Sequence, residues 1–133
     1  MTPQQFEQSL LAMYVWQEAH EDGLAAMMAI TWTIRNRITA AGVQGVGMSW
    51  AEAIQDRTEH LATSLLPDTR DPAFEALLRS IEAAYLGKGK DPACGAQFYF
   101  NLGADDERDR EMILSQPEVH PCVAKVGRYR FFL

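Results

Sequence analysis

The segment YVWQEAHEDG, residues 14–23, brings together four side chains that can take part in catalysis or bind a metal: Glu18, His20, Glu21 and Asp22. A carboxylic acid whose pKa is raised by an apolar surrounding can donate its proton to the leaving oxygen of a glycosidic bond. Glu18 fits this role, because it follows an apolar run and lies near the C-terminus of a predicted helix, where the dipole disfavours an anion. Asp22, one helical turn later, is the nearest second carboxylate. The alternative interpretation is that both acids are ordinary residues of a helix end.

Other kinds of site find little support in the residue pattern. Glu18 and Asp22 share a helical face from which His20 points away, and there is no His-Glu-x-x-His motif, so no metal site is predicted. The sequence has no Gly-x-Ser-x-Gly nucleophile elbow. Its glycines at 42, 45 and 47 lack the Gly-Lys-Ser/Thr ending of a phosphate-binding loop. No cofactor is predicted.

The composition predicts a soluble globular protein with one domain over residues 1–133, with 47% hydrophobic and 23% charged residues. The net charge of −6 argues against nucleic acid as a partner. No segment is long enough to span a bilayer, and the first residues lack the cationic region and cleavage site of a signal peptide. We therefore expect a protein made in the cytoplasm, without membrane insertion. It would act outside the cytoplasm only if a separate system delivered it there.

The two cysteines leave two interpretations open. Cys94 and Cys122 do not form a C-x-x-C pair, so a zinc ribbon or a thioredoxin-like motif is not expected. Two ordinary thiols is the first interpretation. A disulfide between them is the second, and it requires an oxidising compartment.

Local signals predict two helices in the first third of the chain. Thr2 and Gln5 form a capping box around Pro3, and Gly23 separates this helix from a second one over 24–38. The apolar spacing then predicts which side chains face the core. These are Phe6, Leu10, Leu11, Met13, Tyr14, Val15 and Trp16 in the first helix, and Leu24, Met27, Met28, Thr31, Trp32, Ile34 and Ile38 in the second.

Two further helices are predicted in the middle of the chain. After a glycine-containing loop over 39–49, Ser49 and Glu52 form a second capping box for a short helix through Ile54, with Trp50 in the core. Asp71 caps a fourth helix that Gly87 ends. Its predicted core side chains are Phe74, Leu77, Leu78, Ile81 and Tyr85. The stretch between these helices, over 57–70, is predicted to be irregular.

The C-terminal part is aromatic and extended. AQFYFN, residues 96–101, and VGRYRFFL, residues 126–133, predict two strands, with a charged excursion between them. Tyr99 and Asn101 of the first strand could stack on a sugar and hydrogen-bond to it, with Gln97 on the same face. The alternative is a strand that alternates between core and surface. The predicted fold class is mainly α with a small C-terminal β element.

The ordered motifs resemble those of the cell-wall hydrolases of the spore-cortex-lytic type. In that family an apolar residue precedes Glu-Ala-Arg-Gly-Glu, and the following helix ends in Asn-Arg-Val; here WQEAHEDGLAAMMAITWTIRNRI fills those places. The family's C-terminal part runs Asp-Pro-Thr-Gly-Gly-Ala, aromatic residues, Asn, and a closing Ile-Gly-Asn-His-Arg-Phe; here DPACGAQFYFN and KVGRYRFF correspond. The chain departs from the pattern where HED replaces Arg-Gly-Glu, where Cys94 replaces Thr, and in the acidic insertion GADDERDREMI.

The resemblance implies a lysozyme-like α+β fold and a lytic transglycosylase-like activity on peptidoglycan glycan strands. It implies that Glu18 is the catalytic acid and base at the bond between N-acetylmuramic acid and N-acetylglucosamine. Asn36 and Arg37 match the family's Asn-Arg pair and could line or brace the cleft. The alternative is that Arg37 is an ordinary cation, and Asn36 an ordinary polar residue, at a helix end. The predicted substrate-binding residues are Asp22, Asn36, Gln97, Tyr99 and Asn101.

Two other functions stay open at this point. A catalytically inactive relative could bind glycan or serve as a structural part of a phage or a secretion apparatus. An unrelated helical interaction domain is the third possibility, but such a domain would have no reason to keep all of these motifs in this order. An active wall hydrolase would need phage lysis, a phage tail or a secretion system to deliver it.

Overall fold

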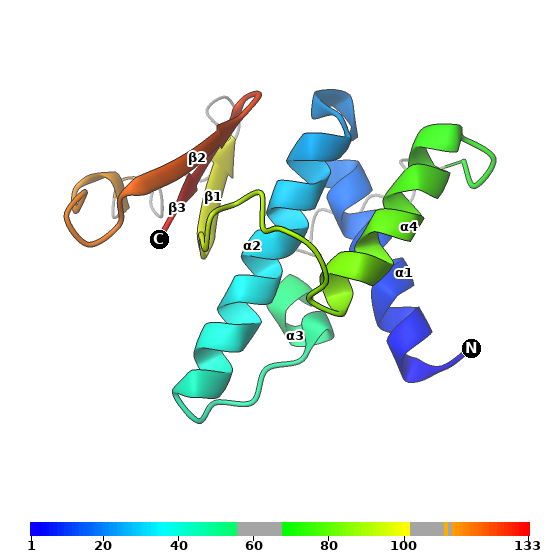
Figure 1. Cartoon of the computed structure of the whole chain (residues 1–133), viewed down its shortest axis with the longest axis horizontal. Helices are drawn as coiled ribbons and strands as arrows, with labels where there is room; N and C mark the ends of the chain where they lie inside the picture. Colours follow the sequence, from blue (N-terminus) through cyan, green and yellow to red (C-terminus); the bar gives the residue numbers. More distant parts are fainter. Residues whose placement is uncertain (56–67, 102–110, 112) are drawn as a thin grey trace.

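The structure, a computed structural model, describes residues 1–55, 68–101, 111 and 113–133 (Figure 1). The elements are α1 (Pro3–Ala19), the 3-10 turn η1 (His20–Asp22), α2 (Leu24–Val43), α3 (Trp50–Gln55), α4 (Pro72–Tyr85), β1 (Phe98–Asn101), β2 (Cys122–Val126) and β3 (Tyr129–Phe132). The predicted fold class, mainly helical with a small antiparallel sheet near the C-terminus, is confirmed. The irregular stretch over 57–70 and the acidic insertion fall largely outside the described residues.

The capping box of α1 forms as predicted. The Thr2 hydroxyl accepts from the Gln5 amide at 3.1 Å, and the Gln5 side chain accepts from the Thr2 amide at 2.9 Å. Leu11, Tyr14 and Val15 are buried in the core. The core position predicted for Phe6 is wrong, because its side chain is 58% exposed; Figure 1 shows the first turns of α1 at the edge of the helical bundle.

Helix α2 is longer than predicted and lies at the centre of the molecule. It continues through residues 39–43, which were expected to be a loop, because two alanines there favour the helix. Helices α1 and α4 pack on one side of α2 and the sheet on the other (Figure 1). The middle turns of α2 are therefore buried on several sides, including Ile30, Trp32 and Thr33. Leu24 lies at the start of the helix and is 40% exposed, so its predicted core position is wrong.

The next two helices begin at their predicted caps. The Glu52 amide donates to the Ser49 hydroxyl at 3.1 Å, and the Ala73 amide donates to the Asp71 carboxylate at 2.9 Å. Helix α4 buries Phe74, Leu77 and Ile81 against α1 and α2. Leu78 is 38% exposed, which corrects the prediction that it faces the core. No helix in the described ranges has the length and apolar content to cross a membrane.

Gly87 ends α4 in a Schellman motif. Its amide donates to the Ala84 carbonyl at 3.0 Å, the Lys88 amide donates to the Ala83 carbonyl at 2.8 Å, and its φ is +70°. A Cβ at this position would collide with the guanidinium of Arg35.

We therefore expect Gly87→Ala to lower the free energy of unfolding by about 1–2 kcal/mol, because an L-residue is strained in the left-handed region. Urea denaturation measures the change. Gly42→Ala is the matched control: it lies within α2 with open space around it, and alanine should hold or raise the stability there. Equal effects of the two substitutions would contradict the explanation.

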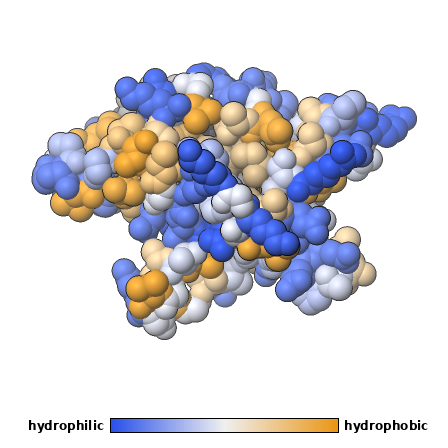
Figure 2. Space-filling view, viewed as in Figure 1, coloured by the Kyte–Doolittle hydropathy of each residue, from blue (hydrophilic) through white to orange (hydrophobic). Residues whose placement is uncertain are grey.

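The sheet has three strands in the order β1-β3-β2, and both pairs are antiparallel. The single strand predicted over 126–133 is wrong, because Gly127, with φ +56°, turns the chain and makes β2 and β3 a hairpin. One face of the sheet joins the helical core through Tyr99, Tyr129 and Phe131. The other face forms a second small cluster of Phe98, Phe100, Ile113 and Phe132. Figure 2 shows apolar and hydrophilic residues side by side over this part of the molecule, as expected where β2 is a partly exposed edge strand.

The two cysteines are free and exposed, as in the first of the two interpretations, and the alternative disulfide is not formed. Cys122 begins β2, whereas Cys94 lies in the turn that leads into β1. Strand β3 separates β1 from β2.

Candidate active site

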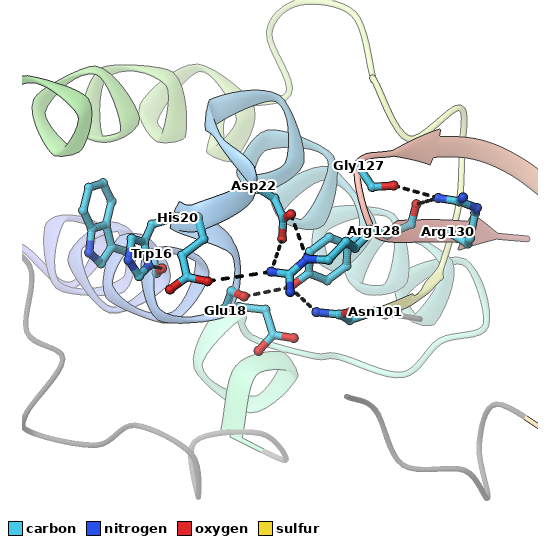
Figure 3. A network of polar contacts seen from close by, with 10 residues as sticks. Trp16, Glu18, His20, Asp22, Asn101, Gly127, Arg128 and Arg130 are labelled. Atoms are coloured by element: carbon cyan, nitrogen blue, oxygen red, sulfur yellow. Dashed lines mark hydrogen bonds and ion pairs between the residues drawn. The ribbon is translucent and has the colours of Figure 1, made fainter. Parts of the chain in front are cut away.

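Glu18 is the next-to-last residue of α1 and is partly buried, as predicted for a carboxylate at the end of an apolar helix. In Figure 3 its carboxylate points away from the ion pair of Asp22, toward the side on which Asn101 ends β1. Glu18 therefore lies where the helical core meets the sheet. Its chemical role stays a prediction at this point.

The backbone of Glu18 is held by the sheet. The Tyr129 hydroxyl donates to the Glu18 carbonyl at 2.7 Å and accepts a longer bond of 3.5 Å from the Asn101 amide (Figure 3). The last carbonyls of a helix lack partners within it, and Tyr129 supplies one. Asn101 is only 7% exposed, and its predicted contact with a glycan stays a prediction.

Asp22 forms a bidentate ion pair with Arg128 of the β2–β3 turn. The Arg128 Nε and Nη2 atoms donate to the two carboxylate oxygens at 3.0 and 2.9 Å. The hydrogen bond to Asp22 raises the pKa of Arg128 above its usual value, so the guanidinium stays charged. The Asp22 side chain is 11% exposed and the Arg128 side chain 55%. Asp22 thus joins η1 to the hairpin, and a contact of Asp22 with substrate stays a prediction.

The Asn-Arg pair near the middle of α2 braces the chain that enters β1. Asn36 donates through Nδ2 to the Asp91 carboxylate at 2.9 Å and to the Ala96 carbonyl at 3.0 Å. Arg37 donates through Nε to the Gln97 carbonyl at 2.7 Å. Both side chains thus brace the backbone that leads into β1. Substrate contacts of Asn36 and of the Gln97 side chain stay predictions.

Tyr99 is the clearest correction among the predicted site residues. Its side chain is fully buried, and its hydroxyl is hydrogen-bonded to that of Tyr14. A ring with no exposed face cannot stack on a sugar, so the predicted stacking contact does not exist in this structure. Tyr99 instead links β1 to α1 from the face of the strand that joins the helical core, while Phe100 on the opposite face is buried in the second cluster.

His20 and its neighbours do not form a metal site. The His20 ring stacks on Trp16 with ring centroids 5.0 Å apart, and its Nδ1 atom lies 2.7 Å from the Trp16 carbonyl oxygen. Throughout the part of the chain that the structure describes, no group of three or more His, Cys, Asp and Glu side chains could hold a metal ion.

Sequence reasoning missed the contacts that three residues make around Glu18: Tyr129 with its carbonyl, Arg128 with Asp22, and Tyr14 with Tyr99. The alternation Tyr129, Arg130, Phe131 does mark Tyr129 as inward-facing. Its partner could not be found in the same way, because Tyr129 and Glu18 are 111 positions apart.

Comparison with known proteins identifies the fold. No protein-family model and no curated protein matches the sequence. The catalytic domain of the Bacillus cereus SleB protein resembles the structure with a TM-score of 0.61 at 22% identity, over 96% of this chain and 89% of that chain. The catalytic domain of the germination-specific lytic transglycosylase SleB from Bacillus anthracis gives a TM-score of 0.56 at 21% identity, over 100% and 97%. The chain has the fold of the SleB catalytic domain. The resemblance to spore-cortex-lytic enzymes that the sequence motifs predicted is thus confirmed for the fold.

Proposed function

We propose that the protein cleaves peptidoglycan as a lytic transglycosylase, with Glu18 as its general acid and base. The observation that carries the proposal is the place of Glu18, a partly buried carboxylate at the end of α1 where helices and sheet meet. The fold supports it, because SleB from Bacillus anthracis, whose catalytic domain it resembles, is described as a lytic transglycosylase.

In this reaction one carboxyl group acts twice, first as a general acid and then as a general base. Protonated Glu18 donates its proton to the oxygen between N-acetylmuramic acid and N-acetylglucosamine, and the bond from that oxygen to C1 of the muramic residue breaks. The Glu18 carboxylate then takes the proton of the C6 hydroxyl of the same residue. The freed C6 oxygen bonds to C1, which leaves a 1,6-anhydro ring and restores protonated Glu18.

The state of Asp22 favours this route over hydrolysis. An inverting hydrolase needs a second carboxylate that activates a water molecule. Asp22 is the second carboxylate that the sequence offered one helical turn after Glu18, and both of its oxygens accept hydrogen bonds from Arg128. With both oxygens engaged by Arg128, Asp22 is committed to an ion pair rather than placed to activate a water molecule.

Product analysis tests the proposal directly. We expect digestion of purified peptidoglycan in ¹⁸O-labelled water to release muropeptides with 1,6-anhydromuramic ends that contain no ¹⁸O by mass spectrometry. Reducing ends that carry ¹⁸O would show hydrolysis and refute the transglycosylase route. Binding to peptidoglycan without any released muropeptide would instead favour the catalytically inactive, glycan-binding alternative.

A further inference from the structure

Two consecutive residues of the β2–β3 hairpin hold the segment that contains Glu18. Tyr129 donates to the Glu18 carbonyl at 2.7 Å, and Arg128 pairs with both carboxylate oxygens of Asp22. The Arg128 guanidinium also lies 3.9 Å from the Glu21 carboxylate. One turn of the sheet is thus fastened to both ends of the segment 18–22 (Figure 3).

The segment between α1 and α2 has little regular structure of its own. Between the two helices lies a single 3-10 turn, η1, without a side-chain cap. Ala19, at φ −142° and ψ 14°, has left the helical conformation, and Gly23 has φ +93°. The direction in which the chain leaves α1 is therefore set by tertiary contacts, and the hairpin supplies two of them.

We propose that the turn of the β2–β3 hairpin is a clamp that positions Glu18, with Tyr129 and Arg128 as its positioning residues. The proposal rests on the proposed function, since it concerns how the catalytic acid is oriented. Tyr129 acts through the backbone of Glu18, and Arg128 acts through Asp22. A displacement of a catalytic group by about 1 Å can lower a rate by about a hundredfold, so a looser clamp reduces kcat without removing any reacting group.

Tyr129→Phe tests the first contact, because it keeps the ring and removes only the hydroxyl. Its matched control is Tyr85→Phe, which removes the hydroxyl that donates to Glu7 at 2.9 Å, near the other end of α1. We expect Tyr129→Phe to lower kcat on peptidoglycan about tenfold, with KM changed less than about twofold, because orientation rather than binding is lost. Tyr85→Phe should keep the parent kcat. A parent-like kcat in Tyr129→Phe overturns the clamp.

A double-mutant cycle tests the second contact. Arg128→Gln and Asp22→Asn should each lower kcat by roughly threefold to tenfold, and the double variant should lose no more than either single one, since both break the same link. Arg79→Gln, which breaks an exposed pair with Glu75 on α4, is the control and should leave kcat unchanged. Losses that multiply in the double variant would overturn the link through Asp22.

Amide hydrogen exchange tests the clamp without relying on activity. We expect faster exchange over residues 18–23 in Tyr129→Phe and parent-like exchange there in Tyr85→Phe, because only the first variant loosens the segment. Unchanged exchange in Tyr129→Phe would overturn the clamp even in an active enzyme. A parent protein that releases no muropeptide would overturn the proposed function, and the exchange measurement would still decide whether the hairpin holds the segment.

Discussion

Glu18→Gln is expected to lower the rate of muropeptide release from purified peptidoglycan by at least about a hundredfold, because a general acid and base contributes typically 10²–10⁴-fold. Glutamine keeps the length and the hydrogen-bonding reach of the side chain but cannot donate the proton that the leaving oxygen needs. The side chain of Glu18 is only partly buried, so the folded state should survive the change. Initial rates of soluble product formation, with circular dichroism to confirm the fold, measure the effect.

The matched control is Glu21→Gln in the same segment. The Glu21 side chain is 75% exposed, and its carboxylate comes within 3.9 Å of Arg128 without the close contacts that Asp22 makes. Its loss should leave the rate within about twofold of the parent, as is usual for a weak, exposed ion pair. Asp22→Asn should reduce the rate far less than Glu18→Gln, since the anhydro-forming route uses one carboxylate. If Glu18→Gln digests peptidoglycan as fast as the parent, the acid is another residue.

Tyr99→Ala is expected to lower the free energy of unfolding by about 3–5 kcal/mol, the range for truncating a large aromatic side chain in a core. Tyr99 is fully buried and its hydroxyl is hydrogen-bonded to that of Tyr14, so the variant leaves a cavity and also removes this buried hydrogen bond. Urea denaturation followed by circular dichroism measures the difference.

Phe6→Ala is the control for this large effect. The periodicity of α1 placed Phe6 in the core, but its side chain is 58% exposed, so we expect a change within about 0.5 kcal/mol. Similar losses in the two variants would contradict the burial that distinguishes them. A milder variant, Tyr99→Phe, tests the sugar contact that the sequence predicted for Tyr99. It should keep the parent KM for peptidoglycan. If the Tyr99 hydroxyl hydrogen-bonded to a bound sugar, its removal would raise KM.

Local features of this protein follow from the sequence because their causes lie within a few residues. The cap of Thr2 on Gln5 and the cap of Asp71 on Ala73 join neighbours in the chain. Gly87 is the natural residue for a helix end with positive φ. The place of Glu18 at the end of α1 is local in the same sense, so the predicted catalytic position needed no knowledge of the packing.

Periodicity was a weaker guide to burial, because it gives the face of a helix but not what covers that face. Leu24 and Leu78 lie on apolar stripes and are still 40% and 38% exposed. The hairpin was missed for a related reason. The run VGRYRFFL is extended on both sides of Gly127, and only strand pairing reveals that this glycine turns the chain.

The order of motifs in the sequence predicted the fold, whereas the contacts of the residues around Glu18 were decided by the tertiary packing. Asn36 meets Asp91 across 55 positions, Tyr14 meets Tyr99 across 85, and Arg128 meets Asp22 across 106. A polar residue that binds substrate and one that braces the backbone look alike in the sequence, because their residue type and their spacing in the motif are the same. They differ only in which partner lies within hydrogen-bonding distance, and that is set by how helices and sheet pack together.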